Sequence, residues 1–164
     1  ASHPVDTQYS LRLGININNP INYISKEGYI SWNFYDLENT HDWIYHFSVD
    51  AHIYDRKFIL NLANDIIFSN PNSYEAFTRE RIYRNGYQRH GYANIEPSIL
   101  SFPINMVQMV QDNESLSVST ELLEKYFLEG YKLLYIIPEN INTFQYYPDT
   151  LLLEKDGLTK KLST

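Results

Sequence analysis

The chain has 164 residues, of which 43% are hydrophobic, and a formal net charge of −7 at pH 7. This length and composition predict a single domain over residues 1–164, with frayed ends at 1–8 and 160–164. The negative charge argues against a nucleic-acid partner, and the absence of cysteine excludes disulfides, thiolate zinc sites and a thiol nucleophile. Because no apolar run reaches the roughly 20 residues of a bilayer-spanning helix, no membrane span is expected.

In the first half of the chain, the residue pattern predicts two strands and two helices. The strands are expected over 9–13 and 44–49, where apolar residues cluster. A short helix is expected over 20–27, because a proline stands in its first turn and Gly28 ends it. A longer helix is expected over 55–68, because its apolar residues recur at helical spacing.

The second half of the chain completes the predicted fold. Its middle predicts either a helix over 74–85 or a strand over 81–87. Later elements are expected in this order: a helix over 120–129, begun by Ser119 or Thr120 and ended by Gly130, a buried central strand over 131–137, and strands over 141–147 and 150–153. Together these elements predict an α+β fold, in which a mixed, mainly antiparallel sheet carries flanking helices.

Arginines and aromatic residues alternate in one segment of this acidic chain. Its candidates for contact with a ligand or partner are Arg81, Tyr83, Arg84 and Tyr87. Guanidinium groups bind phosphates and aromatic faces stack on planar ligands, so the segment suits a phosphate-bearing ligand or an acidic partner. The alternative is a solvated face, on which the arginines pair with nearby acids such as Glu75 and Glu80.

The histidines of the chain give no metal-binding pattern. The spacing of His41, His46 and His52 places them on no single helix face. Surface or hydrogen-bonded histidines are therefore favoured over ligands, and no metal is expected.

The segment 128–141 carries a resemblance to a known family. It runs Leu-Glu-Gly-Tyr-Lys-Leu-Leu-Tyr-Ile-Ile-Pro-Glu-Asn-Ile. It resembles the end of the catalytic core in the A subunits of the pertussis, cholera and typhoid toxins. In these mono-ADP-ribosyltransferases a catalytic glutamate precedes a strand and an Ile-Pro-Glu-Asn-Ile-like turn. Segment 9–12 (Tyr-Ser-Leu-Arg) is similar to the family's first strand, and segment 47–49 (Phe-Ser-Val) is similar to its middle Ser-Thr-Ser strand.

The resemblance implies an ADP-ribosyltransferase-like fold, with NAD as a substrate. It implies that Glu129 is the catalytic carboxylate, that Ser48 fixes this carboxylate, and that Arg12 holds the phosphates of NAD. These three residues are then expected to converge on one cleft. The resemblance also implies a protein as the acceptor of ADP-ribose, and a secreted or injected toxin or effector.

Three neighbours of these residues depart from the family pattern. Leu13 and Gly14 follow the arginine where the family has an acidic residue, and Phe127 stands where the family has Glu or Gln. An active transferase and a catalytically degenerate member therefore both stay open. The second hypothesis is a non-enzymatic protein-binding module, such as a cytoplasmic immunity protein, inhibitor or structural adaptor, which an acidic, tyrosine-rich surface suits.

Overall fold

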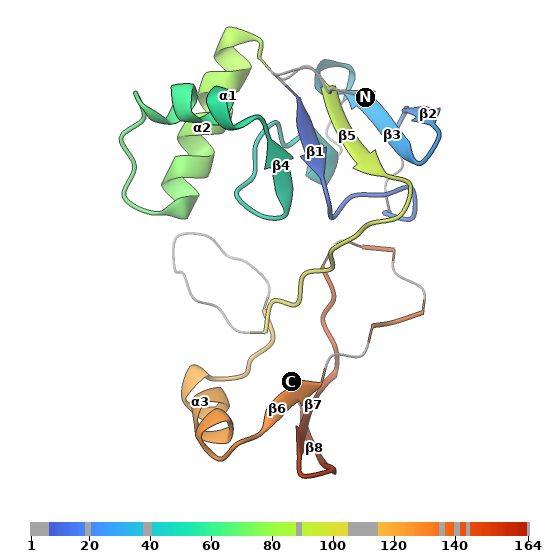
Figure 1. Cartoon of the computed structure of the whole chain (residues 1–164), viewed down its shortest axis with the longest axis vertical. Coiled ribbons are helices and arrows are strands. Elements are labelled where there is room, and N and C mark those ends of the chain that lie inside the picture. The colour runs from blue at the N-terminus through green and yellow to red at the C-terminus, as the bar shows by residue number, and fades with distance from the viewer. Residues whose placement is uncertain are drawn as a thin grey trace. The chain divides into compact units, whose positions relative to one another are not determined.

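The chain divides into two compact units in the computed structural model (Figure 1). Unit 1 comprises residues 1–100 and 142–144, and unit 2 comprises residues 101–141 and 145–164. The structure describes residues 7–18, 21–37, 41–87, 90–104, 115–134, 137–139, 142–143 and 145–163. Each unit is presented by itself, and the single domain expected from the sequence stays a prediction.

Unit 1 is built on a five-stranded mixed sheet with the strand order β2-β3-β5-β1-β4. Its strands are β1 (Gln8–Ser10), β2 (Ile24–Lys26), β3 (Tyr29–Asn33), β4 (His52–Tyr54) and β5 (His90–Asn94). Only the pair β1–β5 is parallel within this sheet, and the other three pairs are antiparallel. The predicted α+β class with a mainly antiparallel sheet is therefore confirmed.

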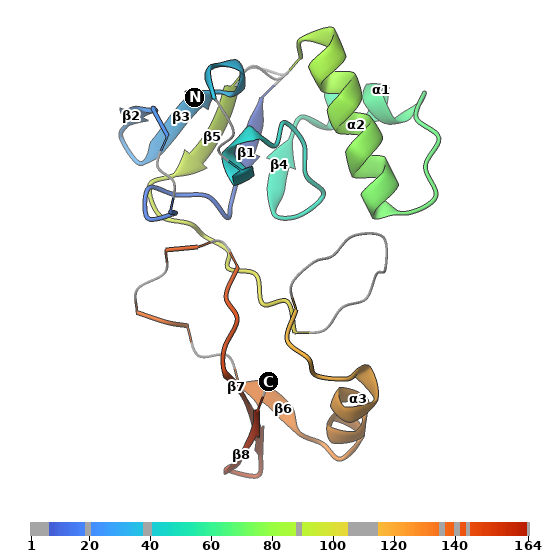
Figure 2. The ribbon, with the colours of Figure 1, turned by 180° about the vertical axis from the view of Figure 1, so that it is seen from behind.

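Two α-helices lie beside the β4 edge of this sheet in both views (Figures 1 and 2). Helix α1 (Arg56–Ala63) begins where the Asp55 side chain accepts a hydrogen bond from the Phe58 amide at 2.8 Å. Helix α2 (Pro71–Asn85) begins with a capping box between Asn70 and Ser73. Of the two alternatives for this segment, the helix is thus correct and the strand over 81–87 is wrong.

The core of unit 1 consists of two apolar clusters. The first gathers around two tryptophans and contains Leu13, Ile17, Ile21, Ile30, Trp32, Phe34, Trp43 and Ala93. The second joins both helices to the segment before β4, through Phe47, Leu62 and Ile82. Burying this apolar surface supplies the main favourable term in folding, and it holds α2 against the residues that precede β4.

Unit 2 is a three-stranded antiparallel sheet with one helix. Its elements are α3 (Thr120–Leu128), β6 (Lys132–Leu134), β7 (Thr150–Lys155) and β8 (Leu158–Ser163), in the strand order β6-β7-β8. The Ser119 side chain caps α3, as predicted from the sequence. A small core forms around Leu116, Val118 and Leu151.

Three predicted elements of unit 1 differ from the structure. The helix over 20–27 is wrong, because Gly28 at φ +82° turns the chain between two strands, β2 and β3, instead of ending a helix. The strand over 44–49 is wrong, because a 3₁₀ helix (His41–Ile44) occupies its start and residues 45–51 form no strand before β4 begins at His52. The prediction that residues 1–8 are frayed is wrong for Thr7 and Gln8, because both are buried. Residues 1–6 lie outside the described residues.

Unit 2 also corrects the sequence analysis. The predicted central strand over 131–137 is an edge strand of three residues, and Lys132 and Leu134 are exposed. Around Gln145 the described residues show only a bridge to Ser101, and parts of the predicted strand over 141–147 lie outside them. The end expected to fray forms strand β8 instead, because its backbone pairs with β7 along six residue pairs.

A search for membrane-spanning segments has a plain outcome. Among the residues that the structure describes, no helix is both long enough and apolar enough to cross a bilayer.

Candidate functional site

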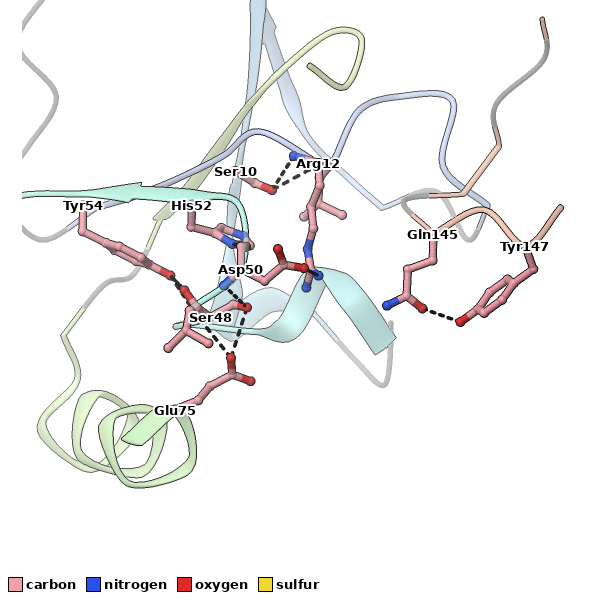
Figure 3. Close-up of polar contacts among 11 residues, drawn as sticks. Ser10, Arg12, Ser48, Asp50, His52, Tyr54, Glu75, Gln145 and Tyr147 are labelled. Carbon is pink, nitrogen blue, oxygen red and sulfur yellow. Dashed lines mark hydrogen bonds and ion pairs between the residues drawn. The ribbon is translucent and has the colours of Figure 1, made fainter. Parts of the chain in front are cut away.

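The first predicted site residue, Arg12, follows strand β1 and is buried, with 9% of its surface exposed. The Ser10 hydroxyl accepts a hydrogen bond from the Leu13 amide at 3.2 Å, which bends the chain after the strand. The Arg12 Nη1 atom forms an ion pair with Asp50 Oδ2 at 2.8 Å (Figure 3). Because a buried charge is costly without a partner, this pair holds the guanidinium in one orientation.

The register between β1 and β4 explains why these two residues meet. The strands are antiparallel, and Ser10 stands opposite His52. Two residues beyond that pair, the same register sets Arg12 opposite Asp50, although they lie 38 residues apart along the chain. The ion pair is thus the continuation of the strand pairing into the turn before β4.

The second predicted site residue, Ser48, lies in the same turn. Its hydroxyl donates a hydrogen bond to Glu75 Oε2 at 3.2 Å and accepts one from the Asp50 amide at 3.2 Å. The Val49 amide also donates to Glu75 Oε2, at 2.9 Å. Helix α2 therefore places a carboxylate on this turn, and Asp50 connects Ser48 to Arg12 (Figure 3).

Two aromatic side chains of β4 complete the group. The Tyr54 hydroxyl accepts a hydrogen bond from the Ser48 amide at 2.7 Å and donates one to the Ser48 carbonyl at 2.8 Å. Burial raises the pKa of the Tyr54 phenol above its ordinary value, so the hydroxyl stays protonated. Burial lowers the pKa of His52 to about 4, and the neutral ring contacts the Asp50 carbonyl through Nδ1. We call Arg12, Ser48, Asp50, His52, Tyr54 and Glu75 the polar cluster.

The third predicted site residue, Glu129, belongs to unit 2. It is the exposed C-terminal cap of α3, and its backbone carbonyl accepts a hydrogen bond from Lys155 Nζ at 2.5 Å. Strand β6 follows three residues later. Since Arg12 and Ser48 belong to unit 1, the convergence of all three residues stays a prediction.

The arginines predicted to contact a ligand already have partners in unit 1. Arg81 forms an ion pair with Asp65 at 2.8 Å, and Arg84 forms one with Glu80 at 2.5 Å. This is the arrangement of the solvated-face alternative. Of the two tyrosines, the ring of Tyr83 stacks on that of Tyr35 with centroids 6.1 Å apart, and the ring of Tyr87 contacts Phe58 edge-on at 5.9 Å.

Four members of the polar cluster were not predicted from the sequence. Asp50 is adjacent in sequence to a predicted site segment, but only the β1–β4 register shows that it faces Arg12. Glu75 was considered only as a partner for arginines, whereas it binds Ser48. His52 and Tyr54 stand at alternate positions of the short strand that follows Ser48. A strand predicted a few residues later than 44–49 would have included both side chains.

Metal binding was searched for separately. The described residues contain no group of three or more His, Cys, Asp or Glu side chains that could hold a metal ion.

Comparison with known proteins found no relative of the chain. No family model, no curated protein and no solved structure matches the chain.

Proposed function

We propose that the chain is an ADP-ribosyltransferase-like toxin or effector domain that transfers ADP-ribose from NAD to a protein. One observation carries the proposal. Arg12 and Ser48, chosen from distant segments by their resemblance to the family, meet in one polar cluster through Asp50. Glu129, immediately before the segment that resembles the family's final strand and turn, is the proposed catalytic carboxylate.

Arg12 is suited to bind the diphosphate of NAD. A guanidinium can contact two phosphate oxygens at once, and a buried one does so with little screening by water. Asp50 holds Arg12 in place, but its own side chain is 52% exposed. Because a half-exposed carboxylate returns to water at little cost, the arginine can turn from Asp50 to a phosphate when NAD binds.

The chemical step needs a carboxylate beside the ribose. In this step the bond between nicotinamide and ribose C1′ breaks, nicotinamide leaves with the bond's electron pair, and a nucleophile of the target protein attacks C1′ and loses its proton to solvent. A carboxylate that accepts a hydrogen bond from the ribose 2′-hydroxyl stabilises the positive charge that develops on the sugar. Glu129 is proposed for this role, and Glu75, held by Ser48 in the polar cluster, is the second candidate.

The test measures NAD binding by calorimetry and nicotinamide release in the same samples. Glu129→Gln is expected to leave NAD affinity nearly unchanged and to lower nicotinamide release by about 10²–10³-fold, as for loss of one transition-state contact. Glu75→Gln then leaves release within a few-fold. Arg12→Ala is expected to weaken NAD binding, whereas the matched control Arg84→Gln, which removes an exposed ion-paired arginine, leaves it unchanged.

The outcomes separate the alternatives. If Glu75→Gln lowers release and Glu129→Gln does not, the catalytic carboxylate is Glu75. If the wild-type chain binds NAD without releasing nicotinamide, the domain is catalytically degenerate. If it binds no NAD, the transferase proposal is wrong.

The second candidate function is a non-enzymatic protein-binding module. The observation in its favour is a set of exposed apolar side chains in unit 2: Phe127 (75% exposed), Leu128 (76%) and Leu158 (74%). Exposed apolar side chains of this size are typical of surfaces that contact another protein. Absence of NAD binding in the experiment above favours this function.

A further inference from the structure

An aromatic cleft in unit 1 lies among residues that neither proposed function uses. It has a volume of about 540 Å³, is open to solvent, and is lined by parts of two 3₁₀ helices, Phe34–Asp36 and His41–Ile44, and of helix α2. This volume falls within the range of about 300–1,000 Å³ that is typical of small-molecule sites. The side chains that give it chemical character are Phe34, Tyr35, His46, Arg79, Glu80 and Tyr83. The Glu80 carboxylate is already paired with Arg84.

The residue that most strongly indicates a ligand in the cleft is His46, which is 9% exposed. Its Nε2 atom is buried and has no hydrogen-bond partner among the described residues. The ring does bond to the backbone of Ile44, and this bond favours the protonated ring, so a ring N–H donates to the carbonyl. That donor must be Nδ1, which leaves Nε2 as an acceptor.

The pKa of His46 agrees with this tautomer. Burial, followed by the nearby charge of Arg79, lowers the pKa below its ordinary value. The ring is therefore neutral at pH 7, and Nε2 keeps its lone pair. A buried acceptor without a donor is rare in folded proteins and calls for an explanation such as a bound group.

Aromatic rings surround this acceptor. The ring of His46 stacks on that of Phe34 at 4.6 Å, and the rings of Tyr35 and Tyr83 meet it edge-on at 5.3 Å and 5.9 Å. Tyr35 and Tyr83 are themselves 42% and 63% exposed. Their faces offer a planar ligand a surface on which to stack.

Arg79 adds a positive charge to the cleft. Its guanidinium lies over the Tyr45 ring, 4.0 Å from the centroid, and the described residues give it no carboxylate partner. It differs in this from Arg81 and Arg84 on the same helix, which both have one. An arginine fixed by an aromatic ring is well placed to bind a carboxylate.

We propose that this cleft binds a small planar aromatic acid that also carries a hydroxyl or N–H donor. The carboxylate pairs with Arg79, the ring packs on Tyr35 and Tyr83, and the donor bonds to His46 Nε2. The proposal does not depend on the transferase function, because it uses no residue of the polar cluster.

The test uses 4-hydroxybenzoate as the probe in calorimetric titrations of the whole chain. We expect binding with a Kd below about 1 mM. Three matched probes each lack one feature: benzoate has no donor, 4-hydroxybenzyl alcohol has no charge, and 4-hydroxycyclohexanecarboxylate has no planar ring. Each is expected to bind at least about tenfold more weakly, since loss of one hydrogen bond, ion pair or ring contact has about this effect.

Variants then assign the contacts. His46→Phe and Arg79→Gln are each expected to weaken binding of 4-hydroxybenzoate about tenfold or more, while Arg81→Gln, which lies outside the cleft on the same helix, leaves it unchanged. The probe series on the wild-type chain decides the question even if His46→Phe does not fold. Absence of binding up to about 10 mM 4-hydroxybenzoate, or equal affinity for benzoate, overturns the proposal.

Discussion

Units 1 and 2 differ in the size of their apolar cores. Unit 1 holds two clusters, which include both tryptophans of the chain, and several of its side chains are almost fully enclosed. Among its described residues, unit 2 has one small cluster. Both units leave large apolar side chains in solvent, such as Ile67 in unit 1 and Phe127 in unit 2. A unit of roughly 60 residues buries a smaller fraction of its chain surface than a larger one. From the larger core of unit 1 we expect it to be the more stable of the two and to hold its side chains in fixed positions, and we expect unit 2 to unfold more easily.

The largest expected effect concerns the tryptophan core of unit 1. Trp32 is 2% exposed, donates a hydrogen bond to the Trp43 carbonyl at 3.1 Å and packs edge-on against the Trp43 ring at 5.0 Å. Trp32→Ala is expected to cost about 3–5 kcal/mol of unfolding free energy. Urea unfolding followed by fluorescence of the remaining Trp43 measures this cost, because that signal comes from unit 1 alone.

The matched change in unit 2 is Leu151→Ala, which removes a side chain that is 4% exposed. We expect it to accelerate amide exchange in α3 and to leave the tryptophan transition in place. If the tryptophan midpoint moves as far as it does in Trp32→Ala, the comparison fails and the chain is the one cooperative domain predicted from its sequence.

The next effect is a loss of stability in mild acid that is confined to unit 1. The pKa of His52 is lowered to about 4 in the folded state, against about 6.5 in the unfolded chain. Between these values the unfolded state binds more protons, so the stabilisation is complete above about pH 6.5 and is lost as the pH falls towards 4. The loss is about 3 kcal/mol. His46, with a pKa lowered in the same direction, adds to it.

Urea midpoints of the tryptophan signal between pH 7.5 and 4.5 test this effect. His52→Gln is expected to flatten the profile relative to the wild type, since the titrating group is gone. The sequence of unit 2 contains no histidine, so exchange in α3 serves as the internal control. Equal slopes for the wild type and His52→Gln would show that other groups cause the acid sensitivity.

The smallest expected losses of stability come from replacing two glycines, one required for space and the other for its backbone conformation. Gly91 on β5 needs space, because a Cβ there would lie 2.3 Å from the indole of Trp32. Gly157 in the β7–β8 turn needs its φ of +77° and meets no atom within 4 Å. Gly91→Ala is expected to cost about 1–3 kcal/mol in unit 1, and Gly157→Ala about 1 kcal/mol in unit 2.

The measurement is again the pair of probes, tryptophan fluorescence and amide exchange. In a double variant that combines Gly91→Ala with a smaller residue at Trp32, the loss should be smaller than the sum of the two single losses, because the clash is steric. Gly157→Asn should be nearly neutral, since asparagine tolerates a positive φ. An equal loss for Gly157→Ala and Gly157→Asn would rule out backbone conformation as the cause.

The helix ends that were predicted correctly from the sequence are those set by local capping interactions. Helix α3 begins at the cap Ser119 and ends beside Gly130, as predicted. Helix α2 ends at Gly86, and α1 begins at Asp55, although it stops five residues earlier than its apolar spacing suggested. A cap needs only a side chain and an amide three residues away, so the sequence alone contains the whole interaction.

Strands and the candidate site depended on partners elsewhere in the chain. The apolar run after Gly130 was predicted to be a central strand, but it forms the edge strand β6. The residues of a strand do not determine whether one or two other strands pair with it, so the sequence of the run could not distinguish the two positions. In the same way the sequence alone selected Arg12 and Ser48, while the β1–β4 register brought Asp50 between them and the packing of α2 brought Glu75. Sequence patterns determine local backbone preferences over a few residues, whereas pairing register and helix docking are chosen by the burial energy of the whole unit.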